Sequence, residues 1–187
     1  GEPSALVWNS NAEITKAMGI ASDPSPENIS YWLGARHKVR SFFNNISAPE
    51  YGRRPGERGS STIDTHEVAA AHMAPLGGTS RYVLRSMGTP SQAATGIQGT
   101  NPLYQTAVER SVGGTPWLPR QGQSITWEGI QGVFSPAQKK NKALQAEVGR
   151  IWADYRSGNL SKEKTLDAVL NAAGGFQPPG WARTRAP

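Results

Sequence analysis

The sequence predicts an all-α fold, and two observations support this prediction. Apolar residues recur at i, i+3 and i+4 in several segments, which places them on one face of a helix. No segment alternates apolar and polar residues in the way that a half-buried strand requires. The 21 glycines and 14 prolines add many turns and loops, so long regular strands are not expected.

The first two predicted helices are short. Residues 11–20 form the first, and Gly19 weakens its end. Ser25 and Pro26 have the residue types of an N-cap and a first helical position, so a second helix begins there and stops at Gly34. The apolar stripes are Ile14, Ala17 and Met18 in the first helix and Ile29, Trp32 and Leu33 in the second.

A third helix is predicted over residues 38–46. Its apolar residues keep the helical spacing: Val39, Phe42, Phe43 and Ile46. The tight connection Ala35-Arg36-His37 joins it to the second helix, so the two form a helix-hairpin-helix. Free N–H groups at the start of the third helix, with Lys38 and Arg40 beside them, are expected to form a binding site for a phosphate group. The alternative is an ordinary turn between helices with solvated basic side chains.

A loop and a capped helix follow. Residues 48–61 are rich in glycine and proline, and the loop either reaches a nucleic-acid backbone or is an insertion. It carries three arginines: Arg53, Arg54 and Arg58. Asp64 or Thr65 is a suitable N-cap for the next, alanine-rich helix, and Glu67 completes a capping-box-like pattern. Capping is a sufficient explanation of Asp64, and it does not exclude a catalytic role.

The C-terminal half contains the most regular patterns. Helices are expected over residues 80–86, 102–112, 124–134, 136–157 and 161–173. The helix over 124–134 turns Trp127, Ile130 and Phe134 to the core, and residues 118–121 are expected to be a linker before it. The helix over 136–157 is the clearest amphipathic one, with its lysines solvated. After the last helix an aromatic segment folds back and ends in a basic tail.

These elements are expected to make one helical domain over residues 1–187. Its parts are an N-terminal arm (1–24), the helix-hairpin-helix and Asp-Thr-His element (25–73), the C-terminal helices (102–175) and a tail (176–187). Other domains or chains of a larger assembly remain open as partners.

Composition excludes several kinds of site. The chain has no cysteine, which rules out a disulfide scaffold, an iron–sulfur cluster and a thiolate zinc site. The spacing of His66 and His72 does not put them on one helix face, so no metal site is expected. No apolar run approaches the length of a membrane span, and the expected location is cytoplasmic, with no membrane partner.

The charge balance favours a polyanionic partner. Twenty lysines and arginines face 14 acidic residues, which gives a net charge of +6. The simplest polyanion is nucleic acid. The alternative is a charge that only keeps the protein in solution.

Two motifs resemble the helix-hairpin-helix DNA glycosylase superfamily. Leu33-Gly34-Ala35-Arg36-His37-Lys38 is similar to the hairpin Leu-Pro-Gly-Val-Gly-Arg-Lys of endonuclease III-type enzymes. Thr62-Ile63-Asp64-Thr65-His66 is similar to their Val-Asp-Thr-His element. The hairpin here is shorter and has one glycine, and the arginine-rich loop lengthens the interval from lysine to aspartate. The chain is also similar, over most of its length, to uncharacterised phage-encoded proteins with a Lys-Val-Arg-x-Phe-Tyr-Asn-Asn and Thr-Ile-Asp-Thr-His pattern.

The resemblance implies a DNA glycosylase in which Lys38 is the nucleophile and Asp64 the catalytic carboxylate. Attack by the Lys38 amine on the sugar C1′ gives a Schiff base and allows AP-lyase activity. If Lys38 is not placed for attack, Asp64 activates water and the enzyme is monofunctional. No organic cofactor is implied, and a monovalent cation at the hairpin is left open. The implied partner is double-stranded DNA.

The residues expected to serve this function fall into two groups. The expected DNA contacts are Gly34, Arg36, His37, Arg40, Arg53, Arg54, Arg58 and His66. The candidates for a base pocket are Asn44, Gln121, Gln123 and Trp127, because amides read base edges and an indole can stack on a base. Core packing is the alternative for Trp127.

Two other classes of function stay open at this point. A non-catalytic DNA-binding module would keep the hairpin and the positive charge, with Lys38 and Asp64 structural. A structural or interaction protein, for example of a phage particle, would use neither side chain chemically. The geometry of Lys38 and Asp64 separates an enzyme from both alternatives, because only an enzyme needs the two side chains in one cleft.

Overall fold

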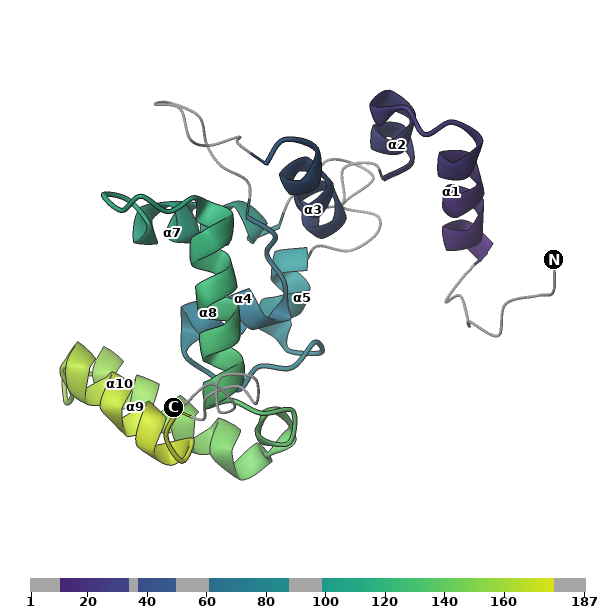
Figure 1. Ribbon diagram of the computed structural model, residues 1–187. Helices are drawn as coiled ribbons and strands as arrows, with labels where there is room; N and C mark the ends of the chain where they lie inside the picture. The colour runs from purple at the N-terminus through teal and green to yellow at the C-terminus, as the bar shows by residue number, and fades with distance from the viewer. Residues whose placement is uncertain (1–10, 34–36, 50–60, 88–98, 177–187) are drawn as a thin grey trace, which may run out of the picture.

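The computed structural model describes residues 11–33, 37–49, 61–87 and 99–176. All regular elements in these ranges are helices, so the predicted all-α fold is confirmed (Figure 1). No described helix is long and apolar enough to cross a membrane. The elements are α1 (Asn11–Ser22), α2 (Pro26–Leu33), α3 (His37–Ser47), α4 (Thr65–His72), α5 (Arg81–Met87), α7 (Asn101–Ser111), α8 (Pro119–Val133), η1 (Gln138–Lys140), α9 (Lys142–Arg156) and α10 (Lys162–Ala172).

The core is built around α4 and α8, which pack against each other in the middle of the molecule (Figure 1). One apolar cluster joins these two helices to α9 and α10: Ala69, Ile130, Val133, Phe134, Leu144, Val148, Val169 and Ala173. A second cluster joins the segment before α4 to α5 and α7: Ile63, Val68, Val83 and Val108. Ile63 is 1% exposed and Val68 is fully buried. Because both side chains are packed in the core, the backbone of the intervening Asp64 is held in place.

The predicted C-terminal helical hairpin is present as α9 and α10, which lie side by side. The single helix predicted over residues 136–157 is wrong in one respect, because Asn141 divides it into η1 and α9. Asn141 is extended, with φ −76° and ψ 106°, and its side chain accepts hydrogen bonds from the N–H groups of Ala143 and Leu144. An asparagine in this role begins a new helix rather than continuing the old one. Lys139, expected to be solvated, is half-buried as a result.

The linker predicted over residues 118–121 is also wrong, since α8 begins at Pro119. Proline suits the first helical position because its missing N–H has no partner there in any case. The Gln121 side chain reaches back and accepts a hydrogen bond from the N–H of Leu118 at 2.8 Å. Together these residues extend α8 by about one turn beyond the expected start and bring Arg120 and Gln121 onto it.

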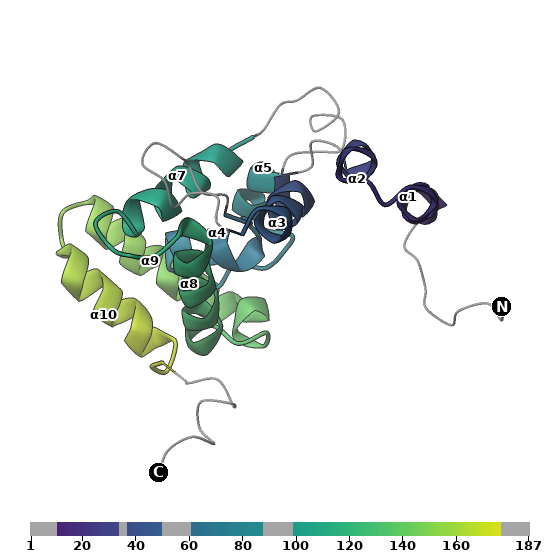
Figure 2. The same ribbon diagram turned by 45° about the horizontal axis from the view of Figure 1, so that its top comes forward.

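The helices α1 and α2 pack on each other and stand to one side of the other helices (Figures 1 and 2). As predicted, Ser25 caps α2, with Asn28 N donating to Ser25 Oγ at 3.3 Å. Gly19 does not end α1. A Cβ there would lie 2.0 Å from the ring of Trp32, so the glycine gives this ring room to cross α1.

The apolar face of α3 is largely uncovered. The exposed fractions are 44% for Val39, 59% for Phe42 and 64% for Ile46. Helical spacing therefore identified the helix but not a buried face. The connection from α2 to α3 lies outside the described residues, as does the arginine-rich loop after α3 apart from its ends, so the helix-hairpin-helix itself stays a prediction.

Candidate active site

Asp64 is the N-cap of α4, as its sequence pattern predicts. Its Oδ1 accepts hydrogen bonds from the N–H groups of His66 at 2.8 Å and Glu67 at 3.1 Å. Its Oδ2 accepts one from the Trp127 indole at 3.2 Å. The side chain keeps 16% of its surface exposed. One carboxylate oxygen is thus held by the helix, while the other is oriented by a side chain of α8.

The backbone before Asp64 is fixed to α8 by one glutamine side chain. Thr62 N donates to Gln123 Oε1 at 2.6 Å, and Gln123 Nε2 donates to the Thr62 carbonyl at 2.6 Å. A primary amide matches the donor and acceptor of one peptide group, so Gln123 pairs with the chain as a strand would. Gln105 adds a hydrogen bond to the Ser61 carbonyl at 3.2 Å. The position of Asp64 therefore depends on contacts with α7 and α8.

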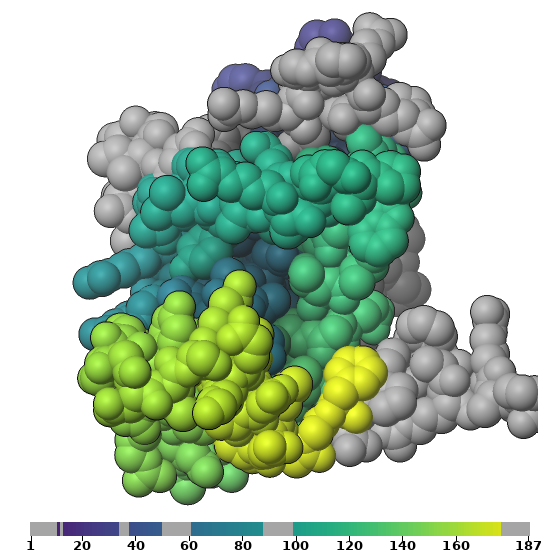
Figure 3. All heavy atoms as spheres, turned by 90° about the vertical axis from the view of Figure 1, so that its left-hand side faces the viewer, coloured from purple at the N-terminus to yellow at the C-terminus, as the bar shows by residue number. Residues whose placement is uncertain are grey.

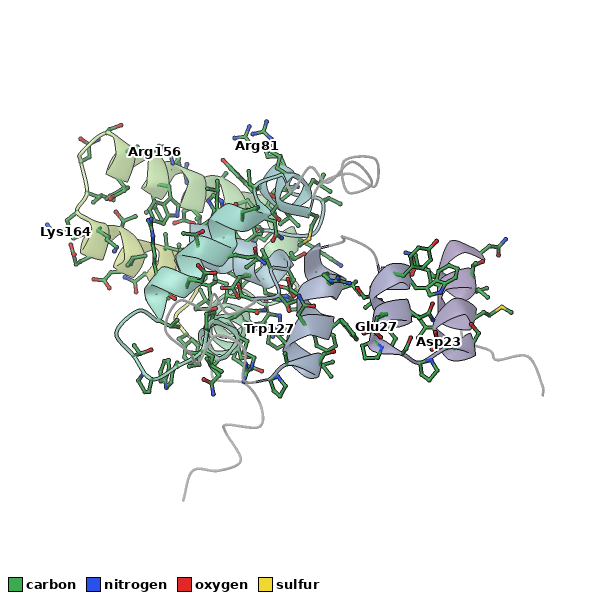
Figure 4. The ribbon with its side chains drawn as sticks, turned by 90° about the horizontal axis from the view of Figure 1, so that it is seen from above. Asp23, Glu27, Arg81, Trp127, Arg156 and Lys164 are labelled. Carbon is green, nitrogen blue, oxygen red and sulfur yellow. The ribbon has the colours of Figure 1, made fainter. Side chains whose placement is uncertain are left out.

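Trp127 and His66 surround the second oxygen of Asp64. The two rings lie 5.1 Å apart between their centroids, and His66 Nδ1 is 3.5 Å from Asp64 Oδ2. In the view from above, Trp127 lies toward the middle of the molecule, whereas Arg81, Arg156 and Lys164 point outward at its rim (Figure 4). The indole is therefore a positioning group for Asp64.

The surroundings of His66 favour its neutral imidazole form. Burial lowers its pKa, the positive charge of Lys139 lowers it further, and Lys38 adds a smaller effect in the same direction. Asp64 raises the pKa through its charge and hydrogen bonding but does not reverse the shift. Lys38 and Lys139 thus both act electrostatically at the Asp64–His66 pair, although they come from α3 and η1.

Lys38 and Asp64 line the same cavity, which has a volume of about 410 Å³. It lies between α3, the segment before α4 and the first turns of α8. The residues that line it are Lys38, Phe42, Asn45, Ile46, Thr62, Asp64, Arg120, Gln121, Gln123 and Ser124. The exposed apolar side chains of α3 form one wall, and Arg120 adds a second positive charge to Lys38.

The structure places only some of the predicted site residues at the cavity. Of the base-pocket candidates, Gln121 and Gln123 line the cavity. Asn44 does not line it and is exposed, whereas the neighbouring Asn45 does line it. Arg40 donates to the Ser30 carbonyl at 3.0 Å and so links α3 to α2. His37 opens α3. The expected DNA contacts that lie outside the described residues are Gly34, Arg36, Arg53, Arg54 and Arg58.

Sequence reasoning missed Arg120, Phe42 and Ile46 as parts of the cavity. Arg120 falls in the predicted linker, although the preceding proline and the following glutamine are the signals of a helix start. The spacing of Phe42 and Ile46 predicts only an ordinary helix face. Only the packing of α3 against the rest of the chain leaves them uncovered beside Asp64.

Glu67 is a buried carboxyl next to this site, with 4% of its surface exposed. Its Oε1 lies 2.9 Å from the Thr126 hydroxyl, which is also 2.9 Å from the Gln123 carbonyl. Instead of closing a capping box, the side chain lines a cavity of about 190 Å³ between α4, α7 and α8. Figure 3 looks onto this face, where the surface is hollowed between α7 and the α9–α10 pair.

Burial raises the pKa of Glu67 from 4.5 to about 7, and the charge of Asp64 acts in the same direction against the Thr126 hydrogen bond. A carboxyl with a raised pKa contributes stability that is complete below pH 4.5 and is lost as the pH rises to about 7. The loss expected from the shift is about 3 kcal/mol.

Replacing Glu67 by glutamine is expected to remove this pH dependence. The amide keeps an acceptor for the Thr126 hydroxyl and carries no charge, so the variant should unfold less readily than the parent protein at pH 8 and equally at pH 4.5. Urea unfolding at pH 4.5, 6, 7 and 8 measures the difference between the two proteins. Parallel stability curves across this range would contradict a raised pKa for Glu67.

The described residues contain no group of three histidine, aspartate or glutamate side chains that could hold a metal ion. Searches against protein-family models, curated proteins and solved structures gave no match to the chain.

Proposed function

We propose that the protein is a DNA glycosylase with AP-lyase activity, in which Lys38 and Asp64 act on a nucleotide flipped into the cavity between them. The observation that carries the proposal is that these two side chains, from separate helical elements, line one cavity. Capping of α4 explains why Asp64 accepts hydrogen bonds from backbone N–H groups, but capping does not require a lysine in the same cavity.

The cavity suits a flipped nucleobase. Its volume of about 410 Å³ lies in the usual range for small-molecule sites. Phe42 and Ile46 offer an apolar face to the ring of a base, and Gln121 and Arg120 offer polar groups to its edge. Because α3 buries so little of its apolar face, a bound base would also cover surface that is otherwise left in water.

The proposed reaction uses both side chains at the sugar. The Lys38 amine forms a bond to C1′ as the glycosidic bond breaks, and the proton that the nitrogen loses goes to the leaving base. The Asp64 carboxylate stabilises positive charge on the sugar as the base departs. The amine, now bonded to C1′, opens the sugar ring and forms a Schiff base. Proton loss from C2′ then expels the 3′ phosphate and cuts the strand.

Borohydride trapping tests the proposal. Duplexes with an abasic site, a uracil or an oxidised base are incubated with the protein, and borohydride reduces any Schiff base to a stable amine. We expect a covalent adduct that maps by mass spectrometry to the peptide containing Lys38. Lys38→Gln should abolish it, and Lys164→Gln, a matched change on the exposed start of α10, should leave it unchanged.

Other outcomes point to other functions. Base release without an adduct would indicate a monofunctional glycosylase in which Asp64 activates water. Binding to DNA without base release or adduct, across the whole panel, would indicate a non-catalytic DNA-binding module. If the protein shows no salt-dependent binding to DNA, the remaining function is that of a structural or interaction protein.

A further inference from the structure

A second cavity lies beside the candidate active site and is strongly basic. Its volume is about 770 Å³. It is lined by Thr65, His66, Pro75, Leu76, Gly77, Gly78, Thr79, Ser80, Pro136, Lys139, Lys140, Lys142 and Gln145. Three lysines from η1 and the start of α9 thus face the loop between α4 and α5, and none of the described residues that line the cavity is acidic.

The positive charge of the three lysines is not balanced by an ion pair within the described residues. None of Lys139, Lys140 and Lys142 forms an ion pair with a carboxylate of the described residues. Like charges this close repel one another, so three unpaired ammonium groups in one cavity are an unfavourable arrangement without a bound anion. The cavity is therefore complementary to a group with several negative charges.

Gln145 braces the basic side of the cavity. Lys142 Nζ donates to Gln145 Oε1 at 3.2 Å, and Gln145 Nε2 donates to the Lys139 carbonyl at 2.7 Å. The opposite side carries the hydroxyls of Thr79 and Ser80 and two glycines, Gly77 and Gly78, that leave the backbone accessible. Ammonium and hydroxyl donors on facing walls are the groups that contact phosphate oxygens.

The cavity lies near Asp64 through two residues. Thr65 and His66 line it, and they directly follow Asp64, which lines the other cavity. Burial lowers the pKa of Lys139, and the charge of Asp64 acts in the opposite direction. A phosphate beside Lys139 would favour its charged form and offset the burial.

We propose that this basic cavity binds backbone phosphates of the DNA duplex next to the flipped nucleotide. The proposal rests on the proposed function, since it names the second contact that a strand makes after its base enters the Lys38–Asp64 cavity. Phosphate contacts of this kind fix the register of the duplex without reading its sequence.

The test compares two double variants with the same change in charge. Lys140→Gln/Lys142→Gln removes two exposed lysines from the cavity, and Lys162→Gln/Lys164→Gln removes two exposed lysines from the start of α10. Because α10 runs back along α9, its start lies near the end of α9, about 20 Å from Lys142. Binding of a fluorescent undamaged duplex is measured from 50 to 200 mM salt.

We expect the Lys140→Gln/Lys142→Gln variant to reduce the slope of log K against log salt by about 2 and to weaken binding at 0.1 M salt by roughly 10- to 100-fold. The control variant should change the slope by less than about 0.5. Equal slopes in the two variants would overturn the proposal, as would tight binding of inorganic phosphate with an unchanged DNA slope, or no duplex binding by the parent protein.

The trapping experiment separates failure of this proposal from failure of the proposed function. An adduct at Lys38 with equal slopes in the two variants would keep the glycosylase and remove the phosphate site. The expected slopes with neither an adduct nor base release on any duplex would keep the phosphate site and remove the glycosylase.

Discussion

Replacing Asp64 by asparagine is expected to lower the rate of base excision by roughly 100- to 1,000-fold while α4 stays folded. Asparagine is as good an N-cap as aspartate, so its side-chain oxygen still accepts from the N–H groups of His66 and Glu67. The neutral amide cannot supply the negative charge that stabilises the positive sugar as the base departs. The variant thus separates the structural role of Asp64 from the catalytic one.

The amide of this variant also meets the Trp127 indole. Asparagine presents an N–H group where Asp64 presents Oδ2, so the indole loses its acceptor at a cost of about 1 kcal/mol. Single-turnover excision on the lesion that forms the adduct measures the rate, and circular dichroism measures the helix content.

Ser161→Ala is the matched control for stability. Ser161 caps α10 by accepting from Lys164 N at 3.3 Å, and its loss should cost about 1 kcal/mol with no loss of excision. Excision by the Asp64→Asn variant within about fivefold of the parent rate would exclude an essential carboxylate and return Asp64 to capping alone.

Replacing Phe134 by alanine is expected to destabilise the protein by about 3–5 kcal/mol. Phe134 is fully buried where α8 ends, in the cluster that joins α4 and α8 to α9 and α10. Its loss leaves a cavity shared by four helices, which cannot close without moving the hairpin. Because whole domains are stable by only about 5–15 kcal/mol, this is a large part of the total.

Thermal and urea unfolding measure the effect, with a fall in Tm of about 8–15 °C expected. Phe176→Ala is the matched control, because the same side chain is 52% exposed there and should cost less than about 1 kcal/mol. Similar losses in the two variants would contradict the position of Phe134 at the centre of the core.

The local features of the candidate site could be predicted because they depend on neighbouring residues. Asp64 has the residue type, position and following helix of an N-cap, and the structure has it capping α4. Ser25 and Ser161 behave in the same way. Where the prediction of a boundary was wrong, at Pro119 and Asn141, the chain still carries a local signal, a proline at a first helical position and an asparagine N-cap.

The direction in which side chains point, and what covers them, could not be predicted in the same way. The apolar spacing of α3 is that of a buried face, yet Phe42 and Ile46 are exposed, since what covers a helix depends on residues far away in the chain. Glu67 has the position of a capping-box residue, yet its carboxyl turns to Thr126, 59 positions away. The pKa of about 7 follows from that burial and not from any motif.

The sequence by itself determined the all-α class, the helices with their main caps, and the two side chains on which a catalytic proposal depends. Helical periodicity and capping act over three or four residues, so they can be seen in the chain alone. Only the tertiary structure decided that Lys38 and Asp64 share a cavity, with Gln123 and Trp127 holding Asp64 in place. It also placed the three lysines near Asp64, because these contacts join segments that lie 26 to more than 60 positions apart in the chain.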